Sequence, residues 1–282
     1  MHTDREKRVE IFEDTMRLCK ENPVLVQAIK KSSENTVFYS PEEYPEKNTG
    51  SSRQSTVINV TSERTLEAAK RLHENNFGKR ITVLNFASAT NPGGGVTMGS
   101  SAQEESLCRC STLYSCLKTD ELWRQFYSMH RSLNNSLYTD ACIYTPGIIS
   151  IKSDTAFPQE EPESEWFSVD VITCAAPNLR EKPNNSMNPG HGTAVKITPD
   201  ELFEIHKKRG THILEIAAAH GADILVLGAF GCGAFRNDPA VVAKAYKELL
   251  QLYKNVFDEL VFAVYCSPKD TNNYDTFKEI LT

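Results

Sequence analysis

The sequence predicts an α/β protein in which helices cover both faces of a mixed β-sheet, with an N-terminal helical extension. Two short apolar runs, residues 80–87 and 223–227, show no polar alternation, which is the pattern of strands in a sheet covered on both faces. Each run leads through a glycine-rich loop into a predicted helix, so the unit strand–loop–helix occurs twice. Such units build three-layer α/β domains with ligand loops at one edge of the sheet.

The elements are expected in a simple order along the chain. Apolar residues recur at helical spacing over residues 3–33, with a break at Asn22-Pro23. Residues 34–56 carry prolines and a Gly-Ser-Ser run, which predict a loop or linker. The further elements expected are a strand at 57–60, helix 63–75, strand 80–87, a helix from near Ser101, helix 120–134, strands 142–151 and 169–175, helix 199–221, strand 223–227, helix 239–253, strand 260–265 and a short terminal helix.

Length and composition limit the classes of protein that are possible. The chain has 282 residues, of which 40% are apolar and 24% charged, and this excludes a disordered, collagen-like or disulfide-scaffold protein. We expect an N-terminal helical extension and linker over residues 1–54 and one larger domain over 55–282. The longest apolar run, 224–230, is too short to cross a membrane, and the charged first residues predict no secretory signal.

Charge and cysteine usage narrow the partners and the compartment. A net charge of −6 argues against direct binding of duplex nucleic acid, because affinity for phosphate backbones derives largely from Lys and Arg. The eight cysteines form no CxxC pair, which predicts free thiols in a reducing cytoplasm. The close trio Cys108, Cys110 and Cys116 has no histidine at zinc spacing, so no metal site is expected.

The first glycine loop, residues 91–95, precedes the sequence Gln103-Glu104-Glu105. Three consecutive glycines are costly in backbone entropy and are tolerated where the chain needs positive φ or approaches a ligand closely. A capping box of Ser101 with Glu104 would place both glutamates in the first turn of a helix. Their side chains would then point about 100° apart, so one can contact a sugar while the other reaches the reacting bond. The alternative is a pair of solvated carboxylates that favour a helix N-terminus.

The second glycine loop, GAFGCGAF at residues 228–235, lies between a predicted strand and a helix. In that position backbone N–H groups can hold a diphosphate, although the loop is neither a Walker loop nor a Rossmann fingerprint. We expect Gly233 to need positive φ and Phe235 to pack on a ribose or base, or else in the core. Cys232 has no histidine nearby in sequence to activate it, so it is not expected to be a nucleophile.

The two loops together resemble the microbial type of poly(ADP-ribose) glycohydrolase, a family of catalytic macrodomains. The resemblance rests on GGG at 93–95, QEE at 103–105 after seven residues, and GCGAF at 231–235, and it covers roughly residues 55–268. It implies a macrodomain-like catalytic domain over residues 55–282 that needs neither metal nor cofactor. A second QEE, at 159–161, lacks a glycine run and is bracketed by prolines, so we interpret it as solvated loop charge.

The resemblance implies hydrolysis of the ribose–ribose O-glycosidic bonds of poly(ADP-ribose), with poly(ADP-ribose) or ADP-ribosylated proteins as substrate and ADP-ribose as product. Glu105 would protonate the leaving oxygen, which suits a glutamic acid of raised pKa, and then act as base on the attacking water. Glu104 would hold ribose hydroxyls. Further substrate-binding residues are expected on the two loops and at the helix start: Asn91, Gly94, Gly95, Val96, Gln103, Gly231, Cys232, Gly233, Ala234 and Phe235.

Two other functions stay open on the sequence alone. The chain could be a macrodomain hydrolase of another ADP-ribosyl linkage, or a module that binds ADP-ribose without cleaving it. The adjacent glutamates argue against a pure binding module, because such a module needs no acid beside the scissile bond. Cleavage of labelled polymer and of a mono-ADP-ribosylated substrate would distinguish the three.

Overall fold

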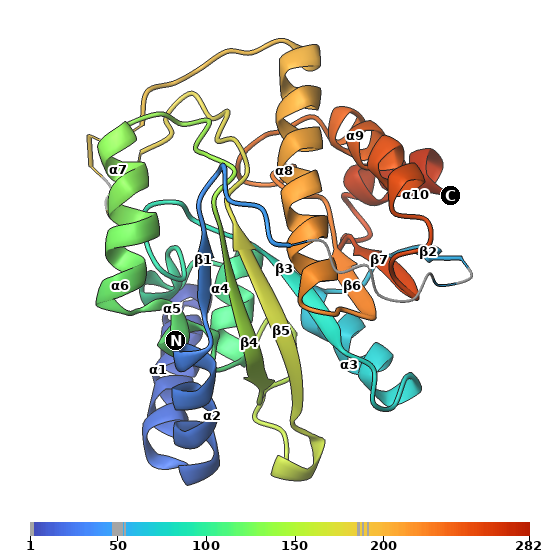
Figure 1. Ribbon diagram of the computed structural model, residues 1–282. Coiled ribbons are helices and arrows are strands. Elements are labelled where there is room, and N and C mark those ends of the chain that lie inside the picture. Colours follow the sequence, from blue (N-terminus) through green and yellow to red (C-terminus); the bar gives the residue numbers. More distant parts are fainter. Residues whose placement is uncertain (1–2, 47–52, 54, 185–186, 188, 191) are drawn as a thin grey trace.

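A mixed seven-stranded sheet in the order β1-β4-β5-β3-β6-β7-β2 forms the centre of the molecule (Figure 1). Strands β2, β7, β6, β3 and β5 are parallel, and β4 and β1 add antiparallel pairs at one edge. The strands are β1 (Val37–Tyr39), β2 (Val57–Thr61), β3 (Ile81–Phe86), β4 (Cys142–Ser150), β5 (Phe167–Cys174), β6 (Ile224–Leu227) and β7 (Glu259–Ala263). The computed structural model describes residues 3–46, 53, 55–184, 187, 189–190 and 192–282.

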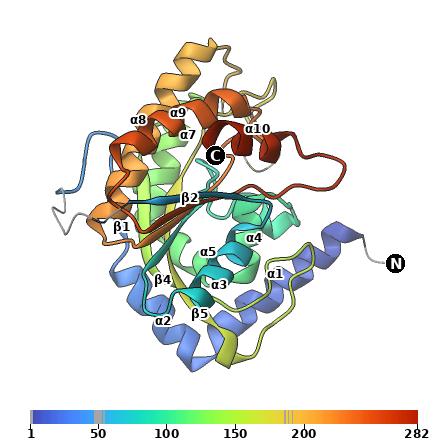
Figure 2. The same cartoon turned by 90° about the vertical axis from the view of Figure 1, so that its right-hand side faces the viewer.

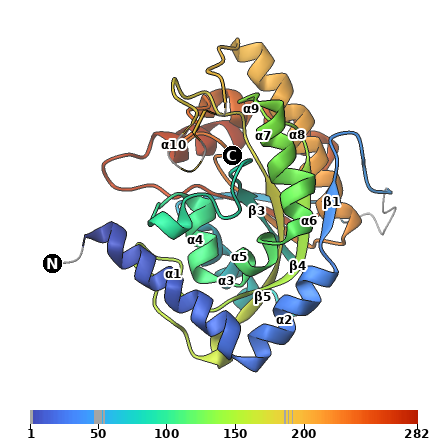
Figure 3. The same ribbon diagram turned by 90° about the vertical axis from the view of Figure 1, so that its left-hand side faces the viewer.

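Helices cover both faces of this sheet, as the apolar strands predict (Figures 2 and 3). In β3, the fully buried Val83 belongs to the core on one face and its neighbour Leu84 to the core on the other. Both faces of the strand therefore avoid water, which explains the missing alternation. One face carries α3 (Thr65–Asn75), α4 (Gln103–Cys110) and α5 (Leu113–Leu117), and the other carries α8 (Pro199–Ala219), α9 (Pro239–Leu252) and α10 (Asn272–Leu281).

The N-terminal helices α1 (Asp4–Glu21) and α2 (Pro23–Glu34) are confirmed, with the predicted break between them. The Asn22 side chain accepts hydrogen bonds from the first N–H groups of α2, and Pro23 occupies the first turn, where its missing N–H costs nothing. Both helices pack on the domain. Phe12 of α1 meets Tyr114 edge to face, with ring centroids 4.9 Å apart, and α2 lies against β4.

The predicted loop over residues 34–56 is wrong in part, because it contains β1. This strand pairs with β4 through the register Val37↔Tyr144 to Tyr39↔Cys142. The Tyr39 hydroxyl also lies 2.8 Å from His220 Nε2. The strand is therefore held by a side-chain hydrogen bond in addition to its backbone pairing with β4. Residues 47–52 and 54 of the predicted linker lie outside the described residues, and the division at residue 54 stays a prediction.

The other predicted elements are found close to their expected bounds, with two differences among the helices. The helix expected from near Ser101 begins at Gln103, and a separate helix, α5, follows it. The single helix expected at 120–134 is α6 (Asp120–Leu122), a π-helical segment (Trp123–Ser128) and α7 (Met129–Leu133) in succession. Short 3₁₀ turns are present at Val96–Met98 and Glu163–Glu165. Within the described residues no helix has the length and apolar character that crossing a membrane requires.

A buried ion pair joins α8 to the segment before β4, and the same arginine binds the backbone just after β5. The Arg209 side chain, only 2% exposed, lies with Nε 3.1 Å from Asp140 Oδ1, and Nη1 donates to the Ala175 carbonyl at 2.6 Å. Lys208 Nζ lies 2.8 Å from the other carboxylate oxygen. Burial alone would raise the pKa of Asp140, but Arg209 and Lys208 outweigh it, and the pKa is lowered.

We expect Asp140→Asn to lower the free energy of unfolding by about 3–5 kcal/mol, because Arg209 is left as an unpaired buried charge. The lowered pKa means that Asp140 stabilises the fold above the unfolded-state pKa of about 3.9 and loses this effect as the pH falls through the folded-state pKa. Urea unfolding at pH 7 and pH 3 measures both. The exposed pair of Arg17 is the control, since Arg17→Gln should leave the free energy of unfolding almost unchanged. A loss for Asp140→Asn that does not shrink in acid would contradict this role.

Candidate active site

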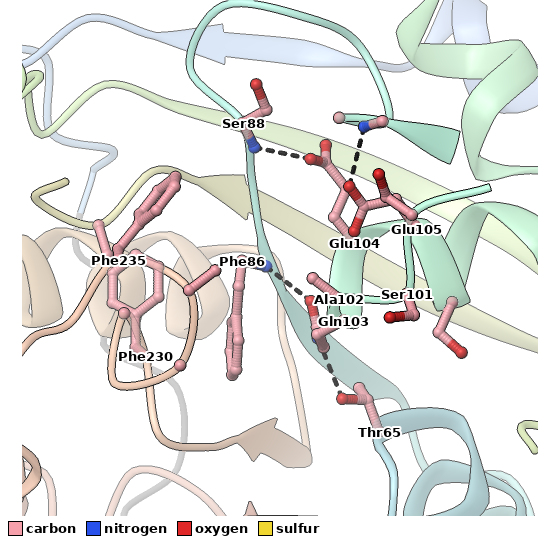
Figure 4. A pocket seen from close by; sticks show the side chains of 18 of the residues that line it. Thr65, Phe86, Ser88, Ser101, Ala102, Gln103, Glu104, Glu105, Phe230 and Phe235 are labelled. Atoms are coloured by element: carbon pink, nitrogen blue, oxygen red, sulfur yellow. Dashed lines mark hydrogen bonds between the residues drawn. The ribbon is translucent and has the colours of Figure 1, made fainter. Parts of the chain in front are cut away.

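A cavity of about 990 Å³ lies at the carboxyl ends of the parallel strands. Segments that follow β2, β3, β5, β6 and β7 all contribute to its lining, as is usual for a ligand site of an open α/β sheet. The volume is at the upper end of the range for small-molecule sites, about 300–1,000 Å³. Figure 4 shows its centre, where the first turn of α4 faces the end of β3 and the second glycine loop.

The first glycine loop is shaped around two carboxyl groups. Gly93 and Gly94 have φ of +66° and +56°, the left-handed region that glycine adopts without strain. A Cβ atom at Gly94 would lie 2.6 Å from Glu105 Oε1 and 3.0 Å from Glu104 Oε2. Any side chain at Gly94 would therefore displace both glutamates, so the glycine is explained by the carboxyl pair and not by the turn alone.

Glu105 has one fixed and one free carboxyl oxygen. Its Oε1 accepts the Gly95 N–H at 2.8 Å, and a dashed line to the Glu105 carboxyl marks this bond in Figure 4. Its Oε2 is buried and has no hydrogen-bond partner among the described residues, although the side chain lines the cavity and is 8% exposed. A buried acceptor without a partner is costly, so this oxygen is suited to a group that a ligand brings.

Glu104 is held by both of its carboxyl oxygens. Oε2 accepts the Ser88 N–H at 2.7 Å, and Oε1 lies 3.4 Å from Asn85 Nδ2. Burial raises the pKa of Glu104 well above its ordinary value, and the nearby charge of Glu105 raises it further. The pair therefore holds a proton at a pH at which a solvated glutamate is ionised.

The start of α4 differs from the prediction. The N-cap is Ala102, without a side-chain cap, and the expected capping box of Ser101 with Glu104 is wrong because the Glu104 carboxylate is bound by Ser88. Gln103 fixes the helix instead: its Oε1 accepts the Phe86 N–H at 2.8 Å, and its Nε2 donates to the Leu84 carbonyl at 2.8 Å.

The second glycine loop uses its glycines differently from the prediction. Positive φ, expected at Gly233, is found at Gly231, where φ is +81° and a Cβ would lie 2.7 Å from Ala176 Cβ. The φ of Gly233 is not positive, and a Cβ atom added to this residue would have no neighbour within 4 Å. Gly231 is thus required by the fold, whereas Gly233 leaves space open toward the cavity. Phe235 lies between Tyr138, 6.3 Å away by ring centroids, and the Arg180 guanidinium, 5.7 Å away.

The structure brings most of the predicted residues to one cavity, but not all. Val96 is fully buried, and its N–H donates to the Gly93 carbonyl. Cys232 is outside the lining, and burial raises the pKa of its thiol, which opposes a thiolate nucleophile. The predicted residues that do line the cavity are Asn91, Gly94, Gly95, Gln103, Glu104, Glu105, Gly231, Gly233, Ala234 and Phe235.

Arg131 of α7 is a positioning residue that no motif in the sequence reveals. Its Nη2 donates to Asn91 Oδ1 at 2.6 Å and its Nε to the Thr90 carbonyl at 2.8 Å, while the guanidinium carbon lies 4.9 Å from the Trp123 ring centroid. These contacts fix the Asn91 amide so that its NH₂ group serves as a donor. Among the residues that line the cavity itself, those that the sequence did not indicate include Arg5, Arg8, Tyr138, Asn178 and Arg180.

The second QEE sequence lies away from this cavity and forms no helix, as predicted. The prediction that the charges of this sequence are solvated is wrong for Glu161, whose carboxylate pairs with Lys70 Nζ at 2.7 Å and whose side chain is only 15% exposed. Glu160 is exposed. In the described part of the chain, no group of three or more His, Cys, Asp or Glu side chains is placed to hold a metal ion.

Comparisons with known proteins point to one family. A family model described as the catalytic domain of microbial-type poly(ADP-ribose) glycohydrolase matches residues 6–153. The poly(ADP-ribose) glycohydrolase structure from Thermomonospora curvata is 31% identical with a TM-score of 0.83, and the match covers 98% of this chain and 99% of that one. The enzyme from Deinococcus radiodurans, solved with ADP-ribose, is 33% identical with a TM-score of 0.73, over 90% and 96% of the chains. A comparison with curated protein sequences gives no match. The structural likeness confirms the predicted macrodomain-like fold.

We expect Glu104→Gln to raise the melting temperature at pH 7.5 by a few degrees, a gain of about 1 kcal/mol for a domain of this size. The raised pKa means that neutral Glu104 stabilises the fold fully below the unfolded-state value of about 4.3, and that this stability is lost as the pH rises through the folded-state pKa. The glutamine stays neutral throughout, so its advantage should vanish at pH 4. Exposed Glu160→Gln is the control. Equal melting temperatures of Glu104→Gln and the wild type at pH 7.5 would contradict a raised pKa.

Proposed function

This chain belongs to the microbial-type poly(ADP-ribose) glycohydrolase family, and from that premise we propose that it hydrolyses the ribose–ribose O-glycosidic bonds of poly(ADP-ribose) and releases ADP-ribose. One observation carries the proposal beyond family membership. The unpartnered Oε2 of Glu105 and a second carboxyl of raised pKa lie in one cavity, between two glycine loops. The cavity thus combines an acid with backbone that a phosphorylated sugar can approach closely.

Glu105 is the general acid and base in this proposal. Both oxygens of Glu104 are already hydrogen-bonded, so the free Oε2 of Glu105 is the oxygen that can meet the scissile bond. The proton that the pair holds passes to the departing ribose oxygen as the glycosidic bond breaks, and positive charge develops on the anomeric carbon. Glu105, then ionised, takes a proton from the water that attacks this carbon. Glu104 orients the ribose through its hydroxyl groups.

The two loops supply the remaining contacts to one ADP-ribose unit. Gly233 leaves its side of the second loop open to the cavity, where backbone N–H groups of the lining residues Gly231, Gly233, Ala234 and Phe235 hold the diphosphate. Phe235 positions the ribose next to the scissile bond. Asn91, whose amide Arg131 orients, donates to a sugar hydroxyl, and Gly94 and Gly95 admit the ribose close to the carboxyl pair.

The physiological substrate in this proposal is poly(ADP-ribose), free or attached to protein, and not duplex nucleic acid. The net charge of −6 supports this choice, because duplex binding depends on an excess of basic residues. We also propose a cytoplasmic location, which the free state of all eight cysteines supports, since thiols persist in reducing compartments. The assignment of residues 55–282 as the catalytic domain belongs to the same proposal.

We expect Glu105→Gln to lower the rate of ADP-ribose release by a factor on the order of 10²–10⁴, because the amide keeps the size of the side chain but delivers no proton. Binding of ADP-ribose, measured by calorimetry, should survive, since most ground-state contacts lie elsewhere. Glu160→Gln is the matched control, an exposed glutamate of the second QEE sequence, and should retain the wild-type rate. Cleavage at the wild-type rate by Glu105→Gln would exclude it as the acid.

We expect Gly233→Val to raise the Kd for ADP-ribose at least about tenfold, the cost of losing one hydrogen bond to a charged group. The new side chain projects into open space, so the melting temperature should hardly change. Gly231→Val is the contrasting variant: its Cβ meets Ala176 and its φ is positive, so it should melt several degrees lower. Undiminished affinity in a folded Gly233→Val protein would show that the second loop does not hold the phosphates.

A further inference from the structure

In the lining of the cavity the acidic side chains are buried and the arginines are accessible, although the chain as a whole is acidic. The carboxyl side chains of the lining are all buried: Glu104, Glu105 and Asp154. The arginines of the lining are half-buried or exposed: Arg5, Arg8, Arg64 and Arg180. A cleft with several accessible guanidinium groups attracts an anion, and it does so in a protein whose net charge is −6.

Two of these arginines come from α1 and are fixed in place by backbone contacts. Arg5 Nε donates to the Met98 carbonyl at 2.7 Å, and Arg8 Nε donates to the Gly99 carbonyl at 2.8 Å. Each bond uses one of the five N–H groups of a guanidinium. Neither side chain forms an ion pair with a described carboxylate, so the terminal nitrogens remain as donors at the cavity wall.

These arginines lie on the opposite side of the carboxyl pair from the second glycine loop. The segment they hold continues to Ser100, whose hydroxyl occupies the place where a Cβ atom at Gly95 would lie. The Gly95 N–H in turn donates to Glu105. Figure 4 shows Phe230 and Phe235 of the second loop on one side and Glu105 and Ser101 on the other. The glycosidic bond that is cleaved at Glu105 therefore has the second glycine loop on one side. The segment held by α1 lies on its other side.

The chemistry of the polymer places a second diphosphate close to the scissile bond. Beyond that bond, a single ribose connects the leaving oxygen to the diphosphate of the next ADP-ribose unit. We propose that Arg5 and Arg8 form a second phosphate subsite, which binds the diphosphate of the ADP-ribose unit on the leaving side of the bond. This proposal rests on the proposed function. The subsite favours polymer over free ADP-ribose, because the diphosphate of a single bound unit reaches only the second glycine loop.

The test compares polymer with the single unit in the full-length protein carrying Arg5→Gln and Arg8→Gln together. Glutamine can still donate to the Met98 and Gly99 carbonyls. The double substitution therefore removes two positive charges but keeps the two hydrogen bonds that hold this segment to α1. We expect the KM for poly(ADP-ribose) to rise about tenfold or more and to depend less steeply on salt, as for lost phosphate contacts. The Kd for ADP-ribose should stay within about twofold. In the Glu105→Gln background, polymer affinity should fall by the same factor.

Two further variants separate charge from structure. Lys7→Gln with Lys20→Gln removes two positive charges from the same helix outside the cavity lining and should keep the wild-type KM. Arg5→Lys with Arg8→Lys keeps the charges and should restore most of the polymer affinity. The subsite is refuted by an unchanged polymer KM, by an equal loss of ADP-ribose affinity, or by lysine variants as weak as the glutamine ones. A wild-type protein that releases no ADP-ribose from polymer would refute the proposed function itself, whatever the arginine variants do.

Discussion

The burial of two carboxyl groups side by side in the first turn of α4 is the constraint on which the rest of the site depends. Such a pair is unfavourable, because each charge is desolvated and repels the other. The structure offsets this cost with the Ser88 and Gly95 N–H groups, one for each carboxyl, and with the proton that the pair holds because the pKa of Glu104 is raised. Gly94 has no side chain because the two carboxyl groups occupy the space where one would lie.

The surrounding elements hold that first turn rigidly. Gln103 ties it to two backbone groups of β3, so the helix cannot slide along the strand. On the outer side, α1 braces the segment between the glycine loop and α4, and Thr15 of α1 donates to the Arg109 carbonyl at 2.6 Å. The N-terminal helices are thus part of the wall of the cavity. A site that needs a strained pair of acids gains from support on both sides, since a looser turn would let the carboxyl groups separate.

The sequence predicts those features that follow from local pattern. The unbroken apolar runs 80–87 and 223–227 identify the central strands. The position of GGG and QEE between strand and helix predicts that Glu104 and Glu105 lie in the first turn of a helix, where the structure has them. The sequence could not predict which of two possible hydrogen-bond donors a side chain binds in the folded protein. Ser101 and Glu104 have the spacing of a capping box, but in the structure the Glu104 carboxylate accepts a hydrogen bond from the Ser88 N–H. Strand β1 has only three residues, which is too short for any periodic signal.

The glycine of positive φ and the arginines of the cavity wall were missed for a different reason. Which glycine of the second loop turns the chain depends on Ala176, a residue far away in sequence that fills the space beside Gly231. Arg5 and Arg8 reach the cavity, and Arg131 reaches Asn91 of its lining, through single long side chains, and no spacing rule relates these arginines to the segments that they bind. Long-range contacts of this kind become visible only when the fold is known.

The central claim is that this carboxyl pair cleaves the bond between ribose units rather than merely binding ADP-ribose. Incubation of the wild-type protein with adenine-labelled poly(ADP-ribose), followed by anion-exchange separation of the products, tests it most directly. We expect monomeric ADP-ribose to accumulate as the polymer shortens. Intact polymer that remains bound to the protein would contradict the account and identify the cavity as a binding site without catalysis.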